Sequence, residues 1–195
     1  MRHAAKLTQL ALISLSLAGC AALPTAEQQA GMAGTARTYS GALIKNLGGE
    51  LKAAMSAGGP EQAISVCKEK APAIAAEVSK NSGMQFKRVS NKNRNPGAVP
   101  DAWEAKAIAD LEKRLAAGAK PETLDTYAVV DGPQGKTFRY AKALVTQSLC
   151  LNCHGTPETM SEATRAKLAA EYPDDKAVGY AAGMVRGIIS VSKPL

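Results

Sequence analysis

One pentapeptide constrains this chain more than any other feature of its sequence: Cys150-Leu151-Asn152-Cys153-His154. It has the pattern C-x-x-C-H, which is typical of covalent attachment of a c-type haem. Two thiols at this spacing reach both vinyl groups of one haem, and the adjacent histidine is placed to bind the iron from one face. We therefore expect a single covalent haem c, attached through Cys150 and Cys153, with His154 as an axial ligand.

Three other uses of these cysteines compete with haem attachment. A redox C-x-x-C pair usually opens a helix after a strand, whereas Gly155-Thr156-Pro157 follows the motif here and favours a loop. A zinc site of Cys67, Cys150, Cys153 and His154 has the right number of ligands. However, neighbouring Cys153 and His154 are awkward to bring onto one tetrahedral ion. A disulfide between Cys150 and Cys153 would close a very small and strained loop.

The N-terminal segment has the features of a lipoprotein export signal. Arg2 and Lys6 flank the start of a short apolar run over residues 7–17, which is too short to span a bilayer. Small residues and then Cys20 follow, in the order expected of a secretory signal, and the placement of Cys20 resembles a bacterial lipobox. This resemblance implies that residues 1–19 are a signal peptide and that Cys20 is lipidated. The remaining residues, 20–195, have a length and apolar content that suit one domain. An ordinary signal peptide cut nearby is the alternative.

Removal of the signal peptide leaves His154 as the only histidine, because His3 is lost with residues 1–19. Two histidine ligands are therefore excluded, and the sixth iron position is left to a sulfur ligand, to water or open. Cys67 is one candidate, although a buried free cysteine is the ordinary explanation for a cysteine on an apolar helix face. The other candidates are the methionines of the mature chain, Met32, Met55, Met84, Met160 and Met184. The first two lie in a helical stripe that is more typical of core packing.

Charge and composition argue against a nucleic-acid partner. The formal net charge of +7 falls to +5 when Arg2 and Lys6 leave with the signal peptide, and two haem propionates would offset part of the remainder. Basic residues are scattered among acidic ones, as in Lys68-Glu69-Lys70, and aromatic residues are few. We therefore expect no nucleic-acid binding.

Hydrophobic periodicity predicts long helices at the start of the mature chain. A capping box at Thr25 and Gln28 opens a helix with apolar residues every three or four positions, interrupted at Gly48-Gly49. A second helix begins after Gly58-Gly59-Pro60, with the proline in the tolerated first turn. This helix should kink or restart near Pro72, which cannot donate a backbone hydrogen bond.

Strands and helices alternate in the rest of the chain. A second capping box, at Asp101 and Glu104, opens a helix that Gly118 ends. The other expected elements are strands over 84–90, 126–131, 137–144 and 184–192, a loop over 91–100 and a helix over 161–171. Helices followed by mixed strands and helices suit an α+β domain with an antiparallel sheet.

Separated motifs occur along the chain: AISVC at 63–67 with APAIA at 71–75, RNP at 94–96 with PDAWE at 100–104, CLNCHG at 150–155 and GIISV at 187–191. Together they resemble a family of PAS-like c-type haem domains, found alone in the cell envelope or as sensor regions of histidine kinases and chemoreceptors. The resemblance covers nearly all of the mature chain. It implies a PAS-like antiparallel sheet flanked by helices, with His154 and Cys67 as the two axial iron ligands.

Two further expectations come from the same resemblance. Arg94 matches a family motif, and its cation could pair with a haem propionate or simply structure its loop. The chain has no kinase or methyl-accepting output segment, so a sensing role would need a separate redox or signalling protein as partner.

The expected ligand pair suggests what the protein does. A thiolate favours ferric over ferrous iron, so reduction would weaken its bond and open a position for CO or NO. We therefore expect a redox or diatomic-gas sensor, and a membrane-tethered electron-transfer cytochrome is the alternative. An enzyme is not expected, because the mature chain has no distal histidine. The export signal places the protein in the cell envelope facing the periplasm, and Ala21 after Cys20 favours the outer membrane.

Overall fold

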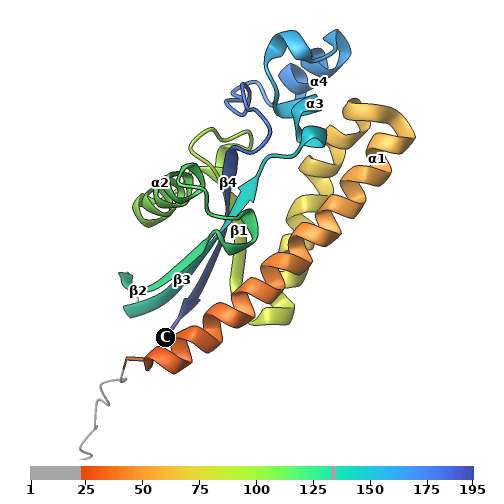
Figure 1. Cartoon of the computed structure of the whole chain (residues 1–195). Coiled ribbons are helices and arrows are strands. Elements are labelled where there is room, and N and C mark those ends of the chain that lie inside the picture. Colours follow the sequence, from red (N-terminus) through yellow and green to blue (C-terminus); the bar gives the residue numbers. More distant parts are fainter. Residues whose placement is uncertain (1–22, 133–134) are drawn as a thin grey trace, which may run out of the picture.

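The computed structural model describes residues 23–132 and 135–195. Its centre is a four-stranded antiparallel sheet in the order β1-β4-β3-β2. The strands are β1 (Gln85–Val89), β2 (Asp125–Gly132), β3 (Gly135–Val145) and β4 (Val185–Pro194). The sheet is flanked by helices (Figure 1), which confirms the predicted α+β class and PAS-like fold. The predicted signal peptide and the lipidation site Cys20 lie outside the described residues.

Helix α1 (Ala26–Ser82) forms two arms that double back on each other (Figure 1). The predicted capping box is present, because the Thr25 side chain accepts from the Gln28 amide and the Gln28 side chain accepts from the Thr25 amide. The predicted interruption at Gly48-Gly49 is wrong. The helix breaks at Gly58-Gly59, where Gly59 has φ 68° and ψ −160°. Residues around Pro72 keep helical dihedral angles, so the predicted restart does not occur there.

The two faces of the sheet bury different side chains. Phe138, Tyr140 and Ile189 pack against α1. Helix α2 (Ala102–Ala116) covers the other face, where its Ile108 packs with Ile188. Because neighbouring residues of a strand point to opposite faces, Ile188 and Ile189 enter different halves of the core.

The C-terminal third of the chain adds short elements around the cysteine motif. These are η3 (Ser148–Cys150), α3 (Leu151–His154), η4 (Pro157–Thr159) and α4 (Glu162–Glu171). Helix α4 packs on α1, where Leu168 and Tyr172 bury Ile64. The remaining short elements are η1 (Pro96–Ala98) and η2 (Pro121–Thr123). Within the described ranges, no helix combines the length and apolar character that crossing a membrane requires.

Candidate functional site

The C-x-x-C-H motif lies at the end of β3, on one tight turn formed by η3 and α3. The turn ends at Gly155, whose amide donates to the Leu151 carbonyl at 2.9 Å. A Cβ at Gly155 would lie 2.7 Å from that carbonyl oxygen and 2.8 Å from Thr159 Oγ1, so glycine is required for this close approach. The sequence predicted that no helix continues beyond the motif, and the structure agrees.

The imidazole of His154 is held in one orientation by the backbone. Its Nδ1 lies 2.7 Å from the Ala177 carbonyl oxygen. Burial and the nearby Arg94 and Arg186 lower the pKa of His154 well below its usual value, so the ring is neutral. A neutral ring that donates from Nδ1 leaves the lone pair on Nε2 for a metal, the arrangement typical of histidine ligands. The 3.3 Å approach of Arg186 Nε to Nδ1 is then a contact, because a protonated Nδ1 cannot accept.

Arg94 fastens this segment to the rest of the domain. Its guanidinium forms an ion pair with Asp175 at 2.9 Å and donates to the Cys153 carbonyl. Asp175 in turn accepts from the Ala177 amide at 2.8 Å, and Ala177 holds His154. Arg94, the residue suggested as a propionate contact, does border the cavity, but its guanidinium is already paired with the Asp175 carboxylate. Its observed contacts are those of the loop-structuring alternative.

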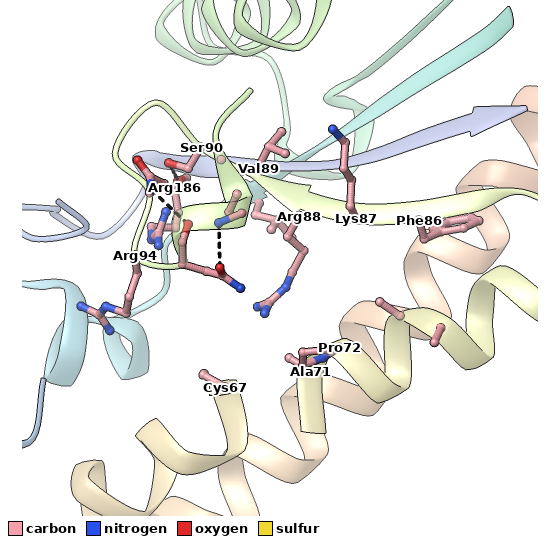
Figure 2. Close-up of a pocket in the computed structure, with 18 of the residues that line it drawn as sticks. Cys67, Ala71, Pro72, Phe86, Lys87, Arg88, Val89, Ser90, Arg94 and Arg186 are labelled. Carbon is pink, nitrogen blue, oxygen red and sulfur yellow. Dashed lines mark hydrogen bonds between the residues drawn. The ribbon is translucent and has the colours of Figure 1, made fainter. Parts of the chain in front are cut away.

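A cavity of about 880 Å³ lies next to the motif, a size typical of ligand sites. Its wall comes from the second arm of α1, from β1, from the loop after β1 and from His154. Figure 2 shows Cys67 on α1 at one side of this space and Arg88 extending into it from β1, whereas Arg94, in the loop after β1, turns its guanidinium away from Cys67 and Arg88. Cys67 and His154 therefore border the same cavity although they are far apart in the sequence.

The charge of the cavity suits an anionic ligand. Five basic residues contribute to its wall, namely Lys80, Lys87, Arg88, Arg94 and Arg186. The Lys87 side chain turns away from Cys67 and pairs with Glu104 at 3.0 Å, so the charge inside the cavity comes from the other four. Among the described residues, no aspartate or glutamate contributes to that wall. A haem carries two propionate carboxylates and needs axial donors for its iron, so the cations, the imidazole and the thiol of this cavity fit it.

Cys67 is better placed than the methionines that competed with it for the sixth iron position. Met32, Met55, Met84, Met160 and Met184 are all outside the cavity wall. Met84 and Met160 are buried in separate parts of the core, and Met184 is 45% exposed.

The zinc and disulfide alternatives receive no support from the geometry. Over residues 23–132 and 135–195, no three His, Cys, Asp or Glu side chains converge closely enough to hold a metal ion. Cys67, Cys150 and Cys153 are free thiols.

The two predicted attachment cysteines, Cys150 and Cys153, are not part of the cavity wall. Cys153 packs against Ile64 and Met160, and burial raises its pKa to about 11. Gln147 donates its amide to Cys150 Sγ at 3.4 Å. The structure therefore keeps both thiols within the turn that carries His154.

Several residues of the site were missed by sequence reasoning. The hold on His154 comes from the backbone carbonyl of Ala177, which has no sequence signature. The pairing of Arg94 with Asp175 joins distant segments and also has none. Arg88 did have a signal, because it alternates with Phe86 on the predicted strand and must share the face that turns toward α1.

The fold and the site together define a class: a PAS-like α+β domain with a C-x-x-C-H turn beside a cationic cavity. The chain belongs to the Tll0287-like family, whose sequence model matches residues 19–194. Among solved structures it is similar to the cyanobacterial heme-protein Tll0287, with a TM-score of 0.58 and 21% identity. That match covers 88% of this chain and 97% of the other. No curated protein matches the chain. The family resemblance expected from the motifs is thus confirmed.

Proposed function

We propose that this chain is a lipid-anchored haem protein of the cell envelope that senses redox state or a diatomic gas. One haem would be attached through Cys150 and Cys153, with His154 and Cys67 as its axial ligands. The observation that carries the proposal is the shared cavity, in which an oriented imidazole and a free thiol border one cationic space. The similarity to a solved heme-protein supports the same cofactor.

A haem held here would supply one-electron chemistry and, at an open iron position, binding of CO or NO. Cys67 would bind as the thiolate, because a metal ligand stays deprotonated although a free thiol titrates near pH ~8.5. An anionic sulfur lowers the reduction potential relative to a methionine ligand. Cys67 would therefore be the ligand whose attachment depends on the iron oxidation state.

The two ligands differ in how the protein holds them. His154 is fixed by Ala177 and by the Arg94–Asp175 pair. Cys67 lies on the second arm of α1, which continues through the Gly58-Gly59 turn to the N-terminal arm. Release or capture of Cys67 would thus act on the helix that leads toward the proposed membrane anchor and toward a signalling partner.

The decisive experiment is spectroscopy of the full-length chain made in a bacterium with haem-attachment machinery. We expect low-spin ferric signals with a thiolate charge-transfer band, lost in Cys67→Ala and retained in Met84→Leu, which removes a buried thioether outside the cavity. Spectra unchanged in Cys67→Ala would refute the proposed ligand. A preparation without covalent haem would refute the proposed cofactor.

Sensing and electron transfer are separated by the reduced state. A sensor should exchange Cys67 on reduction and then bind CO or NO, whereas an electron carrier should keep both ligands and reject the gases. The anchor has its own test in Cys20→Ser. The wild type should fractionate with membranes and this variant with the soluble periplasm, and equal fractionation of the two would contradict lipidation.

A further inference from the structure

The cations of the cavity wall differ in whether the protein already satisfies them. Arg94 pairs with Asp175, and Lys87 pairs with Glu104 at 3.0 Å. Arg186 donates to the Lys92 carbonyl at 3.2 Å and lies over the Tyr180 ring. Three of the five cations therefore already have partners in the protein.

Arg88 and Lys80 form no hydrogen bond or ion pair through their side chains among the residues that the structure describes. Lys80 is exposed and can be hydrated by water, whereas Arg88 is half-buried. Because Arg88 lines the cavity and has no partner among the described residues, its guanidinium is available to pair with an anion bound there.

The orientation of Arg88 suits the same conclusion. It shares the face of β1 with Phe86, which packs toward α1, and Figure 2 shows its side chain extending from β1 into the space next to Cys67 and Ala71. A guanidinium presents two parallel N–H groups that match a carboxylate.

We propose that Arg88 pairs with a propionate carboxylate of the bound haem. Arg94 instead holds the attachment segment, the turn over residues 150–155 that carries the C-x-x-C-H motif, in place. The inference rests on the proposed haem site and goes beyond it, because it assigns the carboxylate contact to a residue outside the sequence motifs. Arg88 is thus a positioning residue that also places a positive charge beside the haem.

The test uses covalently loaded full-length protein and two readouts. Soret-excited resonance Raman spectra report the propionate bending band, and redox titration gives the midpoint potential. Arg88→Gln should shift the band and lower the potential, because loss of a nearby cation favours the ferric state. Arg88→Lys should shift the band but keep a potential close to the wild type.

Two matched variants control for the loss of an arginine. Arg114→Gln removes an arginine that bonds the Asp125 and Thr123 carbonyls outside the cavity and should leave both readouts unchanged. Arg94→Gln tests the competing assignment and should shift the propionate band less than Arg88→Gln does. An unshifted band in Arg88→Gln, or a shift in Arg94→Gln alone, would overturn the assignment. If Arg88→Gln carries no haem, the test rests on Arg88→Lys, and a propionate band at the wild-type position in that variant would overturn the assignment.

The failure of this inference is distinguishable from failure of the proposed function. A wild-type protein without the haem Soret band would refute the haem site itself. A normal Soret band with a propionate band insensitive to Arg88 would refute only the pairing.

Discussion

Arg94→Gln should weaken the fold by loosening the attachment segment, not by changing a haem contact. The Arg94 side chain is 9% exposed and that of Asp175 is 11% exposed. The guanidinium Nε donates to Asp175 Oδ2 at 3.0 Å, and the same group reaches the Cys153 carbonyl. Glutamine is too short and too weakly polar to replace this pairing. The variant would leave a nearly buried carboxylate without its cation.

The magnitude follows from the burial of the pair. Removing one partner of a buried ion pair costs roughly 3–5 kcal/mol. Asp175 keeps one hydrogen bond, from the Ala177 amide at 2.8 Å, so we expect the lower end, about 3 kcal/mol. For a chain of this size that corresponds to a fall in Tm of roughly 6–12 °C.

Guanidinium unfolding followed by far-ultraviolet circular dichroism measures this cost. The matched control is Lys136→Gln, which breaks an ion pair with Asp131 in which both side chains are substantially exposed, and which should cost less than about 1 kcal/mol. The reasoning would be refuted by an Arg94→Gln protein whose unfolding free energy matches that of this control.

Three further substitutions, none of them in the cavity wall, test the stability of the fold. Burial raises the pKa of Asp125, but hydrogen bonds from Arg37 and Tyr140 outweigh it and the net pKa is lowered. A lowered folded-state pKa stabilises above the unfolded value and the benefit is lost as pH falls. Asp125→Asn should therefore be destabilising in urea at about pH 7 and approach the wild type below about pH 3.9, and a constant difference would contradict this. Gly49→Ala should stabilise by about 0.5–1 kcal/mol because Gly49 is an exposed helical residue with nothing within 4 Å of a new Cβ. Gly59→Ala, at φ 68°, should destabilise by about 1–2 kcal/mol, and thermal melts that change in the same direction would reject the argument.

The elements that sequence reasoning located correctly carry local signals. The capping boxes at Thr25 and at Asp101 are both formed in the structure, because each depends on residues three positions apart. The strands were predicted from short runs bounded by turn residues and, at the end of the chain, from the β-branched run over 188–191. The interruption at Gly48-Gly49 was predicted wrongly, since an exposed helix interior tolerates glycine at a cost of about 1 kcal/mol per residue. The left-handed conformation needed for a break occurs at Gly59 instead.

The part of the site that could be predicted from the sequence is the part set by the spacing of the two cysteines and the histidine in C-x-x-C-H. C-x-x-C-H predicts His154 as an axial ligand from the sequence alone, because covalent attachment would fix the spacing between the cysteines and the histidine. Bringing Cys67 and His154 to one cavity depends on how α1 packs on the sheet, which no local pattern contains. Residue reasoning left Cys67 as one candidate beside the methionines, and the family resemblance alone singled it out in advance.

The same distinction explains why we propose the propionate contact for Arg88 and not for Arg94. Arg94 belongs to a recognisable motif, and a motif arginine near a haem invites the propionate interpretation. Its partner Asp175, however, is brought to it from a distant part of the chain, and an arginine that is already paired has little charge left to offer a ligand. Arg88 belongs to an ordinary amphipathic strand, yet its side chain extends into the cavity and has no partner among the residues that the structure describes. For anionic ligands, the informative property of an arginine is thus the absence of a protein partner, which becomes visible only once the long-range ion pairs are known.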